Sequence, residues 1–223
     1  MWALLAGLLT TAVAIAISPL AIVTVILFAT KGSGRTKGTA FLLGYILLEV
    51  LLVGAIVLWG REAGAEVEGS ETNVTIDVVQ ILLGALLLVM AVGQWLRRTS
   101  EHEPKWLGKL DGVKLWQAFG LGFLLAGPLS PKDLPLLISA AGRISQADIT
   151  PEETVVVIAI FTALTAVAVA IPWFVSVFTP TRAEQLLSGM RRWLIANHAV
   201  IMTLLFLILG VKLIGTGAAD LLV

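Results

Sequence analysis

A cluster of prolines interrupts an apolar stretch of this chain that is otherwise long enough to cross a membrane. Residues 115–141 carry very little charge, but Gly127-Pro128-Leu129-Ser130-Pro131-Lys132-Asp133-Leu134-Pro135 lies in their middle. Proline removes backbone donors and clashes with the preceding turn, so one continuous helix cannot pass through this segment. Hydrocarbon penalises the charges of Lys132 and Asp133, and irregular backbone persists at membrane depth only where protein buries it or water reaches it. A broken helix of this kind is typical of the substrate site of a transporter.

The class of protein follows from composition. Hydrophobic residues make up 58% of the chain and charged residues 13%, whereas about a quarter of a typical globular protein is charged. Several uncharged stretches exceed the roughly 20 residues that span a bilayer, which indicates a polytopic helical membrane protein. The chain has no cysteine and two distant histidines, so we expect no disulfide, no metal site and no bound cofactor. The formal net charge of zero gives no sign of a nucleic-acid partner.

Six membrane spans are predicted from the apolar stretches. They cover residues 2–30, 39–60, 74–96, 115–142, 155–178 and 195–217. The first span contains a simpler break at Ser18-Pro19, and the fifth is preceded by Thr150-Pro151-Glu152-Glu153, which predicts a capped helix start. A short amphipathic helix is predicted over residues 181–193, ahead of the sixth span.

The orientation in the membrane follows from the basic residues of the loops. The loops after the first, third and fifth spans carry eleven of them: Lys31, Arg35, Lys37, Arg97, Arg98, Lys105, Lys109, Lys114, Arg182, Arg191 and Arg192. The loops after the second and fourth spans carry only Arg61 and Arg143. This bias predicts cytoplasmic odd-numbered loops, with the N-terminus and the C-terminus outside.

The two proline breaks divide the chain into similar halves. Ser18-Pro19 in the first span corresponds to Ser130-Pro131 in the fourth, and residues 82–87 in the third span correspond to residues 208–213 in the sixth. We therefore predict a three-helix repeat over residues 1–96, a cytoplasmic connector over 97–114 and a second repeat over 115–223. Three is an odd number, so the second repeat enters the membrane from the opposite side. The predicted fold is an all-α integral membrane protein with six transmembrane helices in a 3+3 inverted-topology repeat, helices 1 and 4 being broken at Ser-Pro motifs.

These motifs resemble a known family. The six spans with a Ser-Pro break in the first and Ser130-Pro131-Lys132 in the fourth look like the lysine exporter (LysE) superfamily. Within it the chain is most similar to the GAP or sulfolipid-addressing branch of actinobacteria, also through residues 38–45, Gly-Thr-Ala-Phe-Leu-Leu-Gly-Tyr, at the entry of the second span. The resemblance implies a protein of the bacterial inner membrane that exports amino acids or cations in the wider superfamily and cell-envelope lipids in this branch.

The candidate site residues lie at the breaks and within the second span. The predicted substrate-binding residues are Ser18, Pro19, Ser130, Pro131, Lys132 and Asp133. Lys132 is expected to meet an anionic head group, or else to neutralise Asp133 at a structural kink. Glu49 lies near the middle of the second span and is, with Asp133, the candidate for proton coupling. Tyr45 lies one turn away on the same face and is its expected supporting residue.

The predicted function is secondary export of a cell-envelope lipid or another anionic amphiphile, coupled to protons. Two alternatives stay open: an amino-acid or cation exporter, and a membrane adapter that serves a lipid-synthesis or export machine without transporting. An enzyme is not expected, because the chain shows no cysteine pair, histidine cluster or nucleophile–base pair. The sequence has no Gly-x-x-x-x-Gly-Lys motif for ATP, so the energy must come from a gradient or a partner. A homodimer is also open to such a chain.

Overall fold

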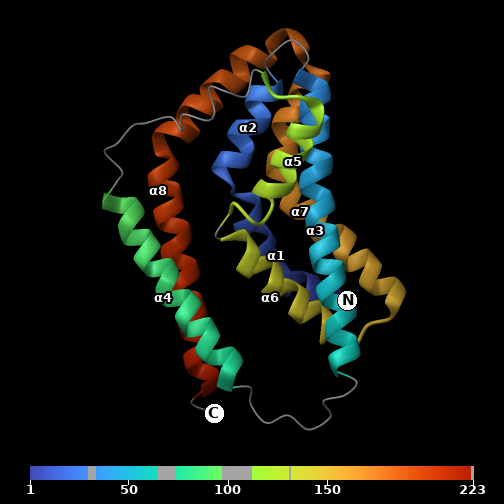
Figure 1. The fold of residues 1–223 in the computed structure, drawn as a ribbon, viewed down its shortest axis with the longest axis vertical. Coiled ribbons are helices and arrows are strands. Elements are labelled where there is room, and N and C mark those ends of the chain that lie inside the picture. Colours follow the sequence, from blue (N-terminus) through green and yellow to red (C-terminus); the bar gives the residue numbers. More distant parts are fainter. Residues whose placement is uncertain (30–33, 65–73, 97–111, 131, 222–223) are drawn as a thin grey trace. The chain divides into compact units, whose positions relative to one another are not determined.

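The computed structural model describes residues 1–29, 34–64, 74–96, 112–130 and 132–221, and within these ranges the chain is helical and contains no strand (Figure 1). The helices are α1 (Trp2–Ala16), α2 (Pro19–Ala29), α3 (Gly34–Gly64), α4 (Val74–Leu96), α5 (Leu115–Leu125), α6 (Asp133–Ser145), α7 (Pro151–Phe178) and α8 (Pro180–Leu221). The prediction of an all-α protein is therefore confirmed for the described part of the chain.

The helices divide into two compact units. Unit 1 comprises residues 1–65 and 103–194, which hold α1 to α3, α5 to α7 and the beginning of α8. Unit 2 comprises residues 66–102 and 195–223, which hold α4 and the remainder of α8. Each unit thus combines segments from both predicted repeats. The repeats were defined by symmetry and not by contact, so their boundaries stay a prediction. Most of the predicted connector, residues 97–111, lies outside the described part.

Unit 1 combines two long helices, α3 and α7, with two pairs of shorter helices, α1 with α2 and α5 with α6. α1 packs against α7, α2 packs against both α7 and α3, and α5 and α6 pack against α3. Both breaks lie part-way along the unit (Figure 1). The interior is closed by large side chains such as Phe41, Phe161 and Leu137, which are fully buried. Leu51, Val155 and other large apolar side chains remain exposed, as expected of surfaces that face lipid.

Two glycines allow α3 and α5 to cross in backbone contact. A Cβ added to Gly44 would come within 2.1 Å of the Phe119 carbonyl oxygen, and one added to Gly122 within 2.0 Å of the Phe41 carbonyl oxygen. Small residues permit such close approach between membrane helices, where packing contacts contribute to association in place of a hydrophobic driving force. The crossing fixes α5, and with it the start of the fourth-span break, against the middle of unit 1.

Unit 2 contains a second glycine contact, between α4 and α8. A Cβ added to Gly84 would meet the Gly210 carbonyl oxygen at 2.8 Å and Ile214 Cγ1 at 2.7 Å. A Cβ added to Gly210 would meet the Gly84 carbonyl oxygen at 2.9 Å and Leu88 Cδ2 at 2.8 Å. The contact is therefore reciprocal: each glycine meets the other glycine and the residue four positions after it.

Helix boundaries follow local sequence signals in most places. Thr150 caps α7: its hydroxyl accepts a hydrogen bond from the Glu153 N–H at 3.2 Å, and the Glu153 carboxylate accepts one from the Thr150 N–H at 3.1 Å. The predicted capping box is confirmed. By contrast, α8 runs unbroken from Pro180 to Leu221, so the short helix predicted over residues 181–193 is wrong as a separate element and continues into the sixth predicted span. Pro172 lies inside α7 without ending it.

Length and apolar composition indicate a multi-pass membrane protein. Among the described residues, three helical segments are long and apolar enough to cross a membrane: Arg35–Gly60, Pro151–Phe178 and Arg182–Gly215. A fourth crossing is formed if α1 and α2, which are bent by 59° at their break, count as one span. The other two predicted spans correspond to α4 and to the pair α5 and α6, which include shorter apolar helices. The six-span arrangement stays a prediction.

Candidate functional site

The first break leaves two carbonyl groups without their usual partners. α1 ends at Ala16 and α2 begins at Pro19. The Ser18 N–H, which in a continued helix would donate to the Ala14 carbonyl, donates to the Ala16 carbonyl at 2.9 Å. Pro19 has no N–H to donate to the Ile15 carbonyl four residues before it. The carbonyl oxygens of Ala14 and Ile15 are therefore available at the end of α1.

The second break is a compact turn between α5 and α6. α5 ends at Leu125, and α6 begins at Asp133. The Ser130 N–H donates to the Gly127 carbonyl at 2.9 Å, and the Asp133 N–H donates to the Ser130 carbonyl at 3.1 Å. These bonds satisfy backbone groups inside the break, as burial requires. The site residue Pro131 lies outside the described residues.

Lys132 connects the two breaks. Its ammonium nitrogen donates to the Ala14 carbonyl at 3.0 Å, to the Ile15 carbonyl at 3.2 Å and to Asp133 Oδ1. An ammonium group has three N–H donors, so this set of acceptors uses all of them. Both Lys132 and Asp133 are 0% exposed.

The contact also matches charge to helix ends. The end of α1 carries the negative pole of its helix dipole, where the Lys132 ammonium lies, and the start of α6 carries the positive pole, where the Asp133 carboxylate lies. A buried ion pair is tolerated only when further hydrogen bonds compensate the loss of water. Here the two carbonyls left unbonded by the Ser18-Pro19 break provide that compensation for the lysine.

The other residues expected at the breaks are also buried. Ser18 is 5% exposed and Ser130 6% exposed, and Pro19 is buried at the start of α2. The structure thus brings Ser18-Pro19 close to Lys132 and Asp133 through the end of α1. In this arrangement a head group would have to displace one of the three acceptors of Lys132 before it could bind the ammonium.

Glu49 is buried in the middle of α3, and its partner comes from α7. Glu49 is 0% exposed, and its Oε2 lies 2.6 Å from Thr165 Oγ1. The carboxyl group also interacts electrostatically with Asp133 and Lys132. Both proton-coupling candidates therefore belong to one buried polar cluster with the lysine, beside α3, which packs against both α6 and α7.

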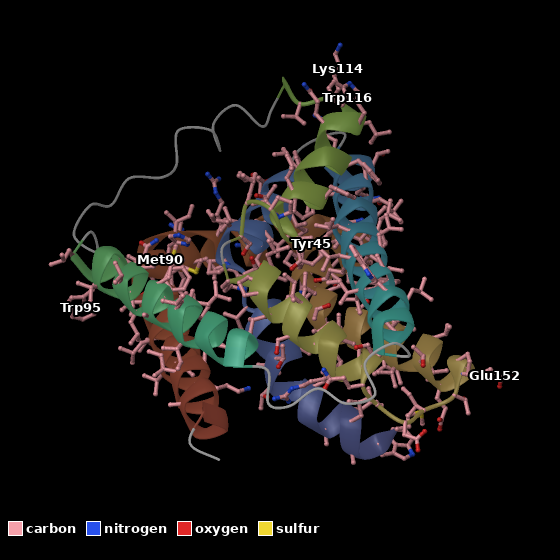
Figure 2. All side chains as sticks on the ribbon, turned by 60° about the horizontal axis from the view of Figure 1, so that its bottom comes forward. Tyr45, Met90, Trp95, Lys114, Trp116 and Glu152 are labelled. Carbon is pink, nitrogen blue, oxygen red and sulfur yellow. The ribbon has the colours of Figure 1, made fainter. Side chains whose placement is uncertain are left out.

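Tyr45 lies inside unit 1 one turn from Glu49, pointing from α3 into the unit (Figure 2). Its ring stacks near Phe41, with 6.3 Å between ring centroids. Its hydroxyl makes no hydrogen bond within the described part of the chain, so the hydrogen-bond partner of Glu49 is Thr165 and not Tyr45.

Four buried polar atoms of this region have no hydrogen-bond partner among the described residues. They are Tyr45 Oη, Glu49 Oε1, Asp133 Oδ2 and Thr162 Oγ1. Buried polar atoms in native proteins are nearly always paired with protein, water or ligand. All four atoms belong to α3, α6 and α7, the helices that contribute Glu49, Asp133 and Thr165 to the cluster.

Thr162 and Thr165 were not among the residues predicted from the sequence. Threonine in an apolar helix commonly bonds its hydroxyl to a carbonyl of its own helix, as Thr24 does to the Leu20 carbonyl at 2.7 Å. The only available signal was that Thr162 and Thr165 are three residues apart and share a face of α7. That signal does not name Glu49, which is 116 residues away along the chain.

The cluster does not resemble a metal centre. Within the described ranges, no group of three or more His, Cys, Asp or Glu side chains is placed to hold a metal ion. Glu49 and Asp133 are the two carboxylates of the cluster, and the Lys132 ammonium lies against one of them. Chemically, the two carboxyl groups can exchange a proton, and the ammonium group can pair with an anion.

Comparison with known proteins identifies the family. Residues 8–219 match the SfLAP family, described as Sap, sulfolipid-1-addressing protein. The chain belongs to the sulfolipid-1-addressing protein family. The predicted resemblance to this branch is confirmed, while membership of the LysE superfamily stays a prediction. No curated protein and no solved structure matches the chain.

Membership of the sulfolipid-1-addressing family agrees with the apolar helices and indicates a membrane protein involved in lipid export. The match extends from α1 into α8, so it includes both helix breaks and the buried cluster. The family and the position of the cluster together provide the basis for a proposal about function.

Proposed function

We propose that this chain is a secondary transporter that moves a cell-envelope lipid or another anionic amphiphile across or out of the membrane, driven by a proton gradient. The observation that carries the proposal is the contact between Lys132 and the end of α1, because it joins two broken helices at a buried charge cluster. Broken helices at membrane depth are the usual substrate and ion sites of secondary transporters. A static membrane anchor has no need for three buried charged groups.

The packing of unit 1 supports an inverted 3+3 repeat. Each proposed broken helix packs against the long helix of the other proposed repeat: α1 and α2 against α7, and α5 and α6 against α3. A two-fold axis that exchanged the repeats would exchange these two sets of contacts. α2 also packs against α3, and this contact has no comparable α6–α7 counterpart among the described residues. Such an axis would also exchange the two breaks, which places the buried cluster close to the boundary between the repeats.

The glycine contact in unit 2 supports the same symmetry independently. At a two-fold axis, a residue contacts its symmetry equivalent. If it also contacts a second residue of the other repeat, its equivalent contacts the matching residue of the first repeat. Gly84 and Gly210 occupy corresponding positions in the third and sixth spans, and they show this reciprocity together with Leu88 and Ile214. The proposed repeat therefore accounts for contacts within each of the two units.

In the proposed mechanism, Asp133 occupies the position that the substrate anion takes. An anionic head group replaces the Asp133 carboxylate at Lys132, so the buried ammonium stays paired throughout the cycle. Glu49 and Asp133 exchange the proton that balances the charge. Buried charges are expensive when unpaired, so binding of the anion and loading of the proton are energetically linked.

The test is lipid movement by the purified full-length protein in liposomes. The probe is a fluorescent phosphatidylglycerol, with a fluorescent phosphatidylcholine as the neutral-head-group control, and leaflet exposure is measured by chemical quenching. We expect the phosphatidylglycerol probe to cross faster when a pH gradient is applied and the gain to disappear with a protonophore. Absence of any lipid movement would contradict the proposal and favour a non-transporting adapter. Transport of lysine or cations without lipid movement would favour the exporter alternative.

A further inference from the structure

The buried cluster is one positive charge short of neutrality. Among the described residues, the buried side chains that carry formal charge are Glu49, Lys132 and Asp133. If both carboxyl groups were ionised, the buried cluster would carry a net charge of −1. An uncompensated buried ion costs on the order of several kcal/mol. The elements packed around Glu49 do not supply the missing charge. α2 and α5 have no charged residue, the charged residues of α7 are at its first turn, and Arg143 is exposed in the last turn of α6, at the opposite end of that helix from Lys132.

The two short oxygen–oxygen distances at Thr165 Oγ1 indicate where the compensating proton lies. Thr165 Oγ1 is 2.6 Å from Glu49 Oε2 and 2.9 Å from the Thr162 carbonyl oxygen. A hydroxyl group has one hydrogen to donate. If Glu49 were ionised, Thr165 would have to choose between two acceptors. If Glu49 is protonated, it donates to Thr165 Oγ1, Thr165 donates to the Thr162 carbonyl, and both contacts are hydrogen bonds.

Asp133 is the less suitable carrier of this proton. Its Oδ1 contacts the Lys132 ammonium, and it lies at the N-terminal end of α6. An adjacent ammonium and a helix N-terminus both favour the ionised carboxylate. Glu49 is in the interior of α3 and has a hydroxyl group as its only hydrogen-bond partner among the described residues.

We propose that Thr165 is the positioning residue of a single-proton site: in the substrate-free state it holds the exchangeable proton on Glu49, while Asp133 is ionised beside Lys132. The inference rests on the proposed function and specifies its coupling site. Loss of the proton, Glu49–COOH giving Glu49–COO⁻ and H⁺, creates a second carboxylate that competes with Asp133 for Lys132. The state of Glu49 thereby acts on the contact that joins the two helix breaks. The other titratable groups facing Glu49 are Tyr45 on its own helix and Asp133 and Lys132 at the start of α6.

The experiment is infrared difference spectroscopy of the full-length protein in lipid nanodiscs, without added substrate. A protonated carboxyl group has its own C=O stretching band, which moves to higher wavenumber when a hydrogen bond is lost. We expect the parent protein to show one such band, Glu49→Gln to abolish it and Thr165→Val to shift it upward. Thr165→Ser, which keeps the hydroxyl group, should restore the parent position. The matched control is Thr24→Val, because Thr24 is equally buried but its hydroxyl bonds only to its own helix.

The outcomes separate this inference from the proposed function. Any of three results would overturn the proton site. The parent could show no protonated-carboxyl band, the band could survive Glu49→Gln, or the band could stay unmoved in Thr165→Val. The spectra require no lipid movement, so the site can stand if the liposome assay fails. Conversely, lipid movement that persists while the band is absent would overturn the site and leave the transporter intact. Size-exclusion profiles of each variant exclude misfolding, and the recovery with Thr165→Ser serves as a second check.

Discussion

Lys132 holds together two helix ends that proline has separated from their ordinary hydrogen-bond partners. Because Pro19 has no N–H and the Ser18 N–H bonds elsewhere, the Ala14 and Ile15 carbonyls need a donor from outside α1. Lys132 therefore stabilises the fold in addition to its proposed role in binding the substrate. At the residue scale, its replacement should affect folding before it affects transport.

The first prediction concerns the contribution of Lys132 to stability. Lys132→Met should lower the free energy of unfolding by about 3–5 kcal/mol, since it leaves a buried carboxylate unpaired, as well as two unsatisfied carbonyls. The double variant Lys132→Met/Asp133→Asn removes both charges and should recover part of that loss. The measurement is the unfolding midpoint in detergent. Equal stability of the parent and Lys132→Met would show that the contact with α1 contributes little.

Glu49 provides a second prediction at the residue scale. Glutamine keeps the shape and hydrogen-bond donor of a protonated carboxyl group but cannot release a proton. Glu49→Gln should therefore fold well and bind an anionic lipid, but its lipid movement should no longer respond to a pH gradient. The comparison is liposome uptake with and without a protonophore. If the variant and the parent show the same protonophore-sensitive uptake, Glu49 has only a structural role.

At the scale of helices, the crossing of α3 and α5 depends on the absence of two side chains. Gly44 and Gly122 each face a carbonyl oxygen of the other helix so closely that a methyl group has no room. Backbone atoms cannot move aside as the end of a flexible side chain can. The crossing is therefore a rigid point, and the break that follows α5 is positioned from it.

The third prediction uses two glycines on the same helix. Gly122→Ala should destabilise the protein by about 3 kcal/mol, the upper part of the range for overpacking, because its Cβ would come 2.0 Å from the Phe41 carbonyl oxygen. Gly120→Ala is the matched control: nothing lies within 4 Å of its added Cβ, and alanine should stabilise the helix by about 0.5–1 kcal/mol. Unfolding midpoints of the two variants should move in opposite directions. A similar effect at both positions would contradict the close crossing.

On the scale of the whole molecule, the proposed function requires opposite ends of unit 1 to face opposite sides of the membrane. Lys114 and Trp116 lie at one end of that unit and Glu152 at the other (Figure 2). The excess of basic residues in the loops predicts that the Lys114 end faces the cytoplasm. The same rule predicts that the N-terminus and the C-terminus lie outside.

The fourth prediction tests this orientation. The chain has no cysteine of its own, so a single introduced thiol can be labelled without background. Glu152→Cys should react with an impermeant thiol reagent added to intact cells, and Lys114→Cys should react only after the membrane is opened. Both side chains are exposed in the structure, which makes them comparable. The reverse pattern would invert the orientation and exchange the inner and outer ends of the proposed pathway.

The sequence by itself determined the class of the protein, the positions of its helices and the locations of both breaks. These features depend on local chemistry: apolar length decides which segments can span, and a proline without an N–H decides where a helix stops. α4 begins and ends at the residues predicted from apolar composition, and the Thr150 capping box starts α7 as its sequence indicates. The continuity of α8 was missed because the amphipathic segment and the span meet without a helix-breaking residue.

The tertiary structure alone decided which residues meet. Lys132 reaches a carbonyl 118 residues away, and Thr165 reaches Glu49 across 116 residues. Periodicity tells which face of a helix a side chain occupies, but not which other helix that face will meet. That choice depends on the fit of whole surfaces, such as the glycine crossing of α3 and α5. For this reason the sequence singled out Lys132, Asp133 and Glu49 as separate candidates, and the packing of the helices made them one cluster with Thr165.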